Sequence, residues 1–210
     1  QTEYPLIENL SELITYIQSK NPSVEEICQF AVIRTFNFLG GIAMFQATLD
    51  PDGTLRSVGQ FGFSKQVMDS WKNANINEDI PTSDALKTNN IIWVTDNSEW
   101  KREYPEIAKY DLELTANTFI AWPISIQGAH MSVLGLCLDR VERPSAELVS
   151  FFETVGGLIA LHQSKSSMSG SVLIDQEVAK KFSLFTRRQR DVIRLIADGL
   201  TNTQIATELG

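Results

Sequence analysis

The stretch TFIAWPISIQGAHMSVLGLCLD, residues 118–139, decides how this chain folds. Two apolar runs, rich in β-branched and aromatic residues, flank residues 127–129, whose small and polar side chains are typical of a turn. We therefore expect two antiparallel strands joined as a hairpin, with successive side chains pointing to opposite faces of the sheet.

A second hairpin is predicted upstream of the first. The runs GIAMFQATL (41–49) and TLRSVGQF (54–61) flank Asp50-Pro51-Asp52-Gly53, whose Pro and Gly supply the backbone dihedrals that a turn requires. The run IIWV (91–94) adds a further extended segment. The sheet should thus contain two hairpins separated by a mixed middle segment.

Helices should flank these hairpins in the sequence. Apolar residues recur at helical spacing from Leu6 to Ile17, and Ser23 with Glu26 has the spacing of a capping box that opens a second helix. After the closing hairpin, Pro144 and Ser145 begin a long helix with a wide apolar stripe. This order of elements predicts an α+β domain.

Four phrases in this order give residues 1–165 a resemblance to a GAF domain. They are GFSKQVMDSW, IPTSDALKTNNIIWVTD, AWPISIQGAHMSVLGLCL and RPSAELVSFFETVGGLIALHQ. The resemblance implies an antiparallel sheet with flanking helices and a pocket that the middle segment closes. GAF domains are typically small-molecule sensors or dimerising modules, and they are seldom enzymes.

The C-terminal stretch TRRQRDVIRLIADGLTNTQIATELG, residues 186–210, predicts two short helices across a tight turn. Thr186 with Gln189, and Thr201 with Gln204, have the spacing of capping boxes, and Gly199 stands where a left-handed C-terminal cap is wanted. Each helix carries an apolar stripe beside its polar residues.

This helical pair resembles the opening of a LuxR-type helix-turn-helix, the DNA-binding domain of many bacterial transcription regulators. The matching positions include Arg188, Gly199, Leu200 and Asn202, whereas Gln189 and Gln204 stand where Glu is usual; the full matching set is Thr186, Arg188, Val192, Leu195, Ile196, Ala197, Gly199, Leu200, Asn202, Ile205, Ala206 and Leu209. In that motif the recognition helix follows next. We therefore expect residues 181–210 to be an incomplete, all-α helix-turn-helix segment, joined by a Ser-rich, flexible linker at 166–180.

The distribution of charge agrees with a nucleic-acid partner for the C-terminal segment. The chain carries a net charge of −8, but residues 180–210 hold six basic and three acidic residues, so this part carries +3 and the rest −11. Without a recognition helix, we expect only phosphate contacts that do not read the base sequence, and specific DNA binding in the full-length protein. The residues expected at the phosphates are Arg187, Arg188, Arg190 and Arg194.

Other function classes find little support in the sequence. No apolar run approaches the length needed to span a bilayer and no signal sequence opens the chain, so we expect a cytoplasmic protein without a membrane partner. Cys28 and Cys137 lie in apolar runs as buried thiols, and His130 and His162 are the only histidines. We therefore expect neither an enzyme nor a metal or other cofactor.

A small, largely apolar or aromatic effector is the expected ligand of the sensor. Aromatic residues gather in the middle segment that should close the pocket, where they combine apolar area with a hydrogen-bonding end, and Gln46 or Tyr104 should orient the ligand. A cyclic nucleotide fits less well, because Lys101 and Arg102 are the only adjacent basic pair there. The predicted ligand-binding residues are Met44, Gln46, Trp100, Tyr104, Tyr110, Phe119 and Trp122.

A homodimer built from the terminal helices is also expected, because these helices carry more apolar residues than a sheet face needs. Its predicted contacts are Leu10, Ile17, Phe151 and Leu158. Two alternatives stay open. One is an acyl-homoserine-lactone-type quorum-sensing regulator, for which Trp71, Asp79 and Trp93 give an incomplete echo of the ligand residues; the other is a GAF module that only dimerises.

Overall fold

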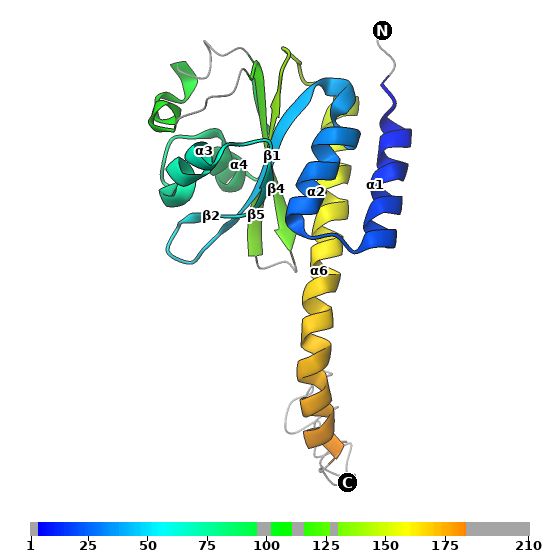
Figure 1. Cartoon of the computed structure of the whole chain (residues 1–210). Coiled ribbons are helices and arrows are strands. Elements are labelled where there is room, and N and C mark those ends of the chain that lie inside the picture. The colour runs from blue at the N-terminus through cyan, green and yellow to red at the C-terminus, as the bar shows by residue number, and fades with distance from the viewer. Residues whose placement is uncertain (1–3, 96–101, 111–115, 127–129, 184–210) are drawn as a thin grey trace, which may run out of the picture. The chain divides into compact units, whose positions relative to one another are not determined.

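The computed structural model describes residues 4–95, 102–110, 116–126 and 130–183. The chain divides into two compact units, Gln1–Ser164 and Lys165–Gly210. The first unit contains a single sheet with helices on both faces (Figure 1). The second is described only where the last helix extends into it.

Five antiparallel strands form the sheet, and both predicted hairpins are present. The order across the sheet is β2-β1-β5-β4-β3, so β5 is the central strand and the two hairpins lie side by side. The expected antiparallel sheet with flanking helices is therefore confirmed. The strands are β1 (Gly41–Leu49), β2 (Leu55–Phe61), β3 (Ile92–Thr95), β4 (Thr118–Ile126) and β5 (His130–Leu138).

Helices α1 (Leu6–Lys20), α2 (Val24–Phe30) and α6 (Ala146–Ser183) lie on one side of the sheet (Figure 1). The predicted capping box begins α2: the Glu26 N–H donates to Ser23 Oγ at 3.3 Å, and the Ser23 N–H donates to the Glu26 carboxylate at 2.8 Å. A π-helical segment, η1 (Ala31–Thr35), and a 3₁₀ turn, η2 (Asn37–Leu39), lead from α2 into β1.

Shorter elements cover the opposite side of the sheet (Figure 1). Ser64 caps α3 by accepting a hydrogen bond from the Val67 N–H at 3.3 Å. The elements on this side are α3 (Lys65–Ser70), the 3₁₀ turn η3 (Trp71–Asn73), α4 (Pro81–Thr88) and the 3₁₀ turn η4 (Pro105–Lys109).

Helix α6 differs from the expectation for the Ser-rich stretch. Residues 166–180 were expected to form a flexible linker, but α6 continues through them to Ser183. The stretch contains no proline and only Gly170 as a strong helix breaker, so a helix that begins at Ala146 can propagate through it. Among the described helices, none combines the length and apolar character that a membrane span requires.

The sheet separates two hydrophobic cores. The core under α1, α2 and α6 centres on the ring of Phe152, which stacks on Phe36 at 4.9 Å and meets Trp122 edge-on at 4.9 Å. The core on the other side contains Phe45, Phe119 and the middle segment. Because both faces of the sheet are covered, residues 43–47 of β1 are all buried.

The predicted dimer residues occupy different environments. Phe151 is 2% exposed and its ring packs edge-on against Phe36 at 5.8 Å, so it belongs to the core of its own chain and is withdrawn from the dimer contact. Its burial follows from helical geometry, since adjacent residues 151 and 152 both fall within the wide apolar stripe of α6. Leu10, Ile17 and Leu158 are half-buried at the edge of the same core.

Two neighbouring glycines of α6 should respond oppositely to alanine. A Cβ at Gly156 would lie 2.9 Å from both Ile124 Cγ2 and Trp122 Nε1, so Gly156→Ala should lower the free energy of unfolding by about 1–3 kcal/mol. Gly157 is exposed and a Cβ there meets nothing within 4 Å, so Gly157→Ala should raise it by about 0.5–1 kcal/mol. Urea unfolding of the two variants checks this. Equal effects would contradict close packing of the Trp122 indole on α6.

Candidate functional site

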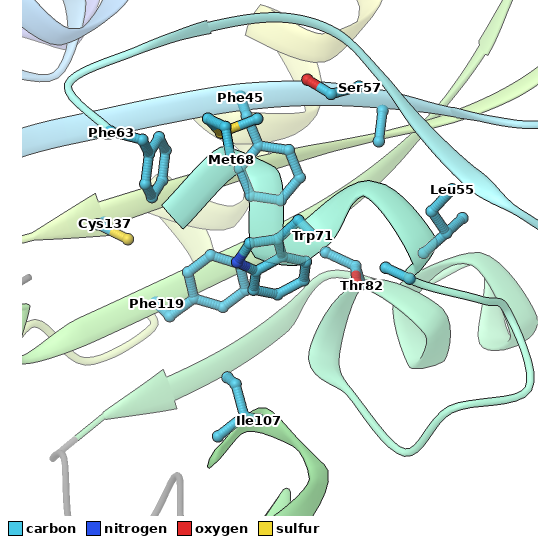
Figure 2. Close-up of a pocket in the computed structure, with 12 residues that line it drawn as sticks. Phe45, Leu55, Ser57, Phe63, Met68, Trp71, Thr82, Ile107, Phe119 and Cys137 are labelled. Atoms are coloured by element: carbon cyan, nitrogen blue, oxygen red, sulfur yellow. The ribbon is translucent and has the colours of Figure 1, made fainter. Parts of the chain in front are cut away.

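The candidate site is an apolar pocket on the side of the sheet away from α6. Its walls come from β1, β2, β4 and β5 and from the short elements that cover them (Figure 2). The cavity inside is small, with a volume of about 30 Å³. The lining residues are Phe45, Ala47, Leu55, Ser57, Phe63, Met68, Trp71, Ala74, Thr82, Ile107, Phe119 and Cys137.

Two phenylalanines and a glycine form the floor of this pocket. Strand pairing places Phe45 opposite Gly135, and the Phe45 and Phe119 rings lie nearly parallel with centroids 6.4 Å apart. A Cβ at Gly135 would collide with the Phe45 ring and would lie 3.1 Å from Phe119 Cζ. Glycine at position 135 therefore leaves room for two large rings on neighbouring strands.

The outer wall is formed by side chains that are only half-buried. Trp71 stacks on Tyr110 with centroids 4.2 Å apart. The Trp71 and Phe45 rings, both drawn in Figure 2, have centroids 5.9 Å apart. Phe63 and Met68 are also half-buried, and Ser57 is exposed. These residues lie on short elements, so this wall is the part of the pocket that can rearrange at least cost.

Most polar groups near the pocket have partners within the chain. The Tyr104 hydroxyl donates to Asp84 at 3.1 Å, and the Tyr110 hydroxyl donates to Glu78. Burial raises the pKa of both phenols, and these carboxylates raise it further. The exception is Thr82, which is 1% exposed and whose Oγ1 has no hydrogen-bond partner within the described structure.

The structure brings only some of the predicted ligand residues to this pocket. Phe119 lines it, whereas Tyr104 and Tyr110 belong to the surrounding core without lining the free space. The Tyr104 hydroxyl, which was expected to orient a ligand, is bonded to Asp84 instead. Trp100 lies outside the described residues.

Three of the predicted ligand residues lie on the opposite face of the sheet. Met44 and Trp122 pack in the core under α6, and the 1% exposed side chain of Gln46 also points to that helix. Gln46 and Gln163 form a reciprocal amide pair, with N–H···O distances of 2.9 and 2.7 Å. The expectation that these residues face the pocket is therefore corrected. On β1 the alternation was predicted correctly but the wrong face was assigned to the pocket; on β4 the predicted pair Phe119 and Trp122 lies on opposite faces, and only Phe119 lines the pocket.

Sequence reasoning missed most of the lining, including Phe45, Ala47 and Thr82. One signal was present in the sequence. The pocket face of the three central strands combines the small residues Ala43, Ala47, Ala121 and Gly135 with the rings of Phe45 and Phe119, whereas the other face carries mainly larger side chains, among them Met44, Ile120, Trp122, Leu134 and Leu136. The small residues leave space in front of the sheet, and once the strand order is known they indicate which face lines the pocket.

The residues that echo an acyl-homoserine-lactone site are not brought together. Trp71 lines the pocket, but Trp93 packs against the core on the other face and donates from Nε1 to the Glu142 carbonyl oxygen at 2.7 Å. Asp79 is exposed, and its N–H donates to Glu106. The geometry therefore offers no common site for this set.

The two thiols are separated by the sheet. Cys137 lines the pocket and Cys28 lies in the core under the helices. Burial raises the pKa of each thiol to about 12. Thiolate is the reactive form, so neither cysteine is prepared for nucleophilic or redox chemistry. Within the described ranges, no group of three or more His, Cys, Asp or Glu side chains is placed to hold a metal ion.

Comparison with solved structures identifies the fold of the first unit as that of GAF domains. The GAF domain of a phosphoenolpyruvate-protein phosphotransferase from Coxiella burnetii aligns with a TM-score of 0.59 and 16% sequence identity. The alignment covers 79% of this chain and 96% of the Coxiella domain. The phycoerythrobilin-bound GAF domain of a cyanobacterial phytochrome aligns with a TM-score of 0.56 and 11% sequence identity. The alignment covers 80% of this chain and 100% of the phytochrome domain. At these identities the likeness shows the fold alone.

A further structural neighbour is an enzyme. The free methionine-R-sulfoxide reductase from Neisseria meningitidis, in complex with its substrate, has a TM-score of 0.60 and 10% identity, covering 80% of this chain and 96% of its own. No curated protein matches the chain. Residues 183–210 match the model of bacterial regulatory proteins of the luxR family, which agrees with the helix-turn-helix resemblance.

Both native thiols should resist alkylation while the protein is folded. With a pKa of about 12, the thiolate fraction of Cys137 at neutral pH is on the order of a thousandfold lower than that of a free cysteine. Iodoacetamide should therefore modify an introduced Ser57→Cys rapidly and Cys28 and Cys137 only after unfolding, as followed by mass spectrometry. Rapid alkylation of Cys137 in the folded chain would contradict this prediction and would show that the thiol is reactive.

Proposed function

We propose that this chain is the sensory portion of a LuxR-type transcription regulator, whose GAF-fold domain binds a small, largely apolar ligand. The luxR-family match at residues 183–210 supports the DNA-binding role, and the GAF fold supports the sensory one. The regulator acts in the cytoplasm, where its DNA target is. The observation that carries the ligand proposal is the aromatic pocket around Phe45, Trp71 and Phe119.

The lining of the pocket favours an uncharged ligand. None of the twelve lining residues is charged, and seven carbon-rich side chains surround the free space: Phe45, Leu55, Phe63, Met68, Trp71, Ile107 and Phe119. An anionic ligand such as a cyclic nucleotide would have to be desolvated without a basic partner in this lining. A flat or compact apolar molecule would instead exchange water contacts for aromatic faces.

Strand β1 offers a physical connection from the pocket to α6. Phe45 and Ala47 line the pocket, and Gln46, between them, is paired with Gln163 on α6. The Phe45 ring fills the space that a side chain at position 135 would occupy, so it already lies against Gly135. A ligand that displaces this ring therefore shifts either the ring or the β1 backbone relative to Gly135. Such a shift of β1 reaches the helix through the Gln46 amide.

A dimerising module is the second candidate, and the small pocket favours it. Free space of about 30 Å³ holds no organic ligand without rearrangement. Helix α1 also exposes Ile7 (83%) and Ile14 (37%), which lie seven residues apart on one face. We propose a homodimer through this face, with Leu10 and Ile17 at its border.

Ligand binding is tested by Trp71 fluorescence during titration with a panel of uncharged aromatic compounds. A sensor should show saturable quenching, and Trp71→Phe should remove this change because Trp71 contacts the ligand. Ser57 is an exposed lining residue, so Ser57→Phe should block the entrance of the pocket and weaken binding at least tenfold. This corresponds to a loss of about 1.4 kcal/mol or more in binding free energy. Ser57→Ala is the matched control. If no compound quenches Trp71 and native mass spectrometry finds no bound molecule, the dimerising module is the better description.

The homodimer is tested by sedimentation velocity of the chain at tens of micromolar, a range in which interfaces of ordinary affinity are populated. Ile7→Asp combined with Ile14→Asp should produce a monomer, because two charges would be buried in an apolar contact. Thr15→Asp with Ser19→Asp adds the same charge at exposed polar positions of α1 that lie away from the face of Ile7 and Ile14, and it should leave the dimer intact. A wild-type monomer would refute the proposal.

A further inference from the structure

The hydroxyl of Thr82 is an unusual group to find in the apolar pocket. Its residue is 1% exposed, and Oγ1 has no hydrogen-bond partner within the described structure. An unpaired hydroxyl is unfavourable in a buried position, so a group of this kind calls for an explanation. Figure 2 shows the Thr82 side chain among the lining residues.

The position of Thr82 in α4 explains why the chain itself does not satisfy this hydroxyl. Thr15, Thr88 and Thr154, which lie further along their helices, each donate to the carbonyl oxygen four residues earlier. Thr82 follows directly after Pro81, the first residue of α4, so no helical carbonyl lies one turn before it. The hydroxyl must find a partner outside its own helix.

The start of α4 also lacks a side-chain cap. The residue before the helix is Ile80, whose side chain has no oxygen that could accept from the first amides, and Pro81, Thr82 and Ser83 are all buried. The first amides of a helix have no partner within it, and they form the positive end of its dipole. A buried, uncapped helix start beside an unpaired hydroxyl favours a hydrogen-bond acceptor in the pocket.

The charges around α4 decide between an anionic and a neutral acceptor. Glu78, Asp79 and Asp84 surround the first turn of α4 in the sequence, and Glu106 approaches it by accepting from the Asp79 N–H at 2.6 Å. No lysine or arginine lines the pocket. An anion would be repelled by these carboxylates, whereas a carbonyl oxygen carries only a partial charge.

We infer that Thr82 is the polar anchor of the pocket, and that the ligand is an uncharged, mainly apolar molecule with one carbonyl-type acceptor. This inference rests on the proposed sensor function. The Thr82 hydroxyl donates to the acceptor, and the aromatic side chains of the lining contact the rest of the molecule. The hydroxyl thereby selects among apolar ligands of similar shape.

Isothermal titration of the whole chain with three probes tests the inference. Acetophenone carries the acceptor, isopropylbenzene has nearly the same shape without it, and benzoate replaces it by a charge. Wild type should bind acetophenone about fivefold more tightly than isopropylbenzene, the worth of one hydrogen bond, and should bind benzoate more weakly than acetophenone. Thr82→Val should lower acetophenone affinity about fivefold and leave isopropylbenzene affinity unchanged.

Thr35→Val is the matched control. Thr35 is also 1% exposed with an unpaired Oγ1, but it lies in η1 and does not line the pocket. Both variants should keep or raise the melting temperature, because each removes an unpaired buried hydroxyl, and only Thr82→Val should change the preference for acetophenone.

The outcomes separate this inference from the function on which it rests. If acetophenone and isopropylbenzene both bind, but Thr82→Val leaves their ratio as in Thr35→Val, the anchor is refuted and the sensor function stands. If benzoate binds most tightly, the neutral ligand class is overturned. If none of the three probes binds to the wild-type chain, the sensor function fails and the inference fails with it.

Discussion

Antiparallel pairing of β1, β5 and β4 is the constraint on which the rest of this structure depends. Each row across these strands belongs to one face: Ala121, Gly135 and Phe45 face the pocket, whereas Trp122, Leu134 and Gln46 face α6. A shift of one residue in register would exchange the two faces. Trp122 would then enter the pocket, and Phe45 would meet the helices. The pocket and the contact with α6 therefore arise from one set of backbone hydrogen bonds.

Element order and fold could be predicted because their signals are local. A capping box at Ser23 and a turn at residues 50–53 need no knowledge of distant contacts, and both are where the sequence placed them. The facing of β1 could not be predicted in the same way. All residues from Ala43 to Ala47 are buried, so polarity does not alternate along the strand and period-two reasoning leaves two equivalent phases. The side-chain sizes around Gly135 resolve this only when the strand order is known.

The burial of Gln46 shows how the same ambiguity affects function. A polar residue in a strand beside a predicted pocket is easily interpreted as a ligand contact. Here the amide lies on the far face, where the reciprocal pair with Gln163 satisfies its hydrogen bonds. The neighbouring His162 donates from Nε2 to the Pro22 carbonyl oxygen at 2.9 Å. Two adjacent residues of α6 are thus held by polar contacts to β1 and to the α1–α2 connection, so the last turns of α6 in the first unit are tied to both.

The small volume of the pocket determines the free-energy cost of binding a ligand. In the proposed sensor, a ligand would bind only to conformations in which half-buried lining side chains, such as Trp71, Met68 or Phe63, have moved outward, because the closed pocket has a volume of about 30 Å³. The apparent dissociation constant is then the intrinsic one divided by the populated open fraction. The cost of opening lowers affinity, but it also keeps the ligand-free state in one conformation, with Phe45 against Gly135. A pocket that is closed at rest would give the proposed sensor two states, closed and ligand-bound, and a sensor requires two such states before it can report a ligand through α6.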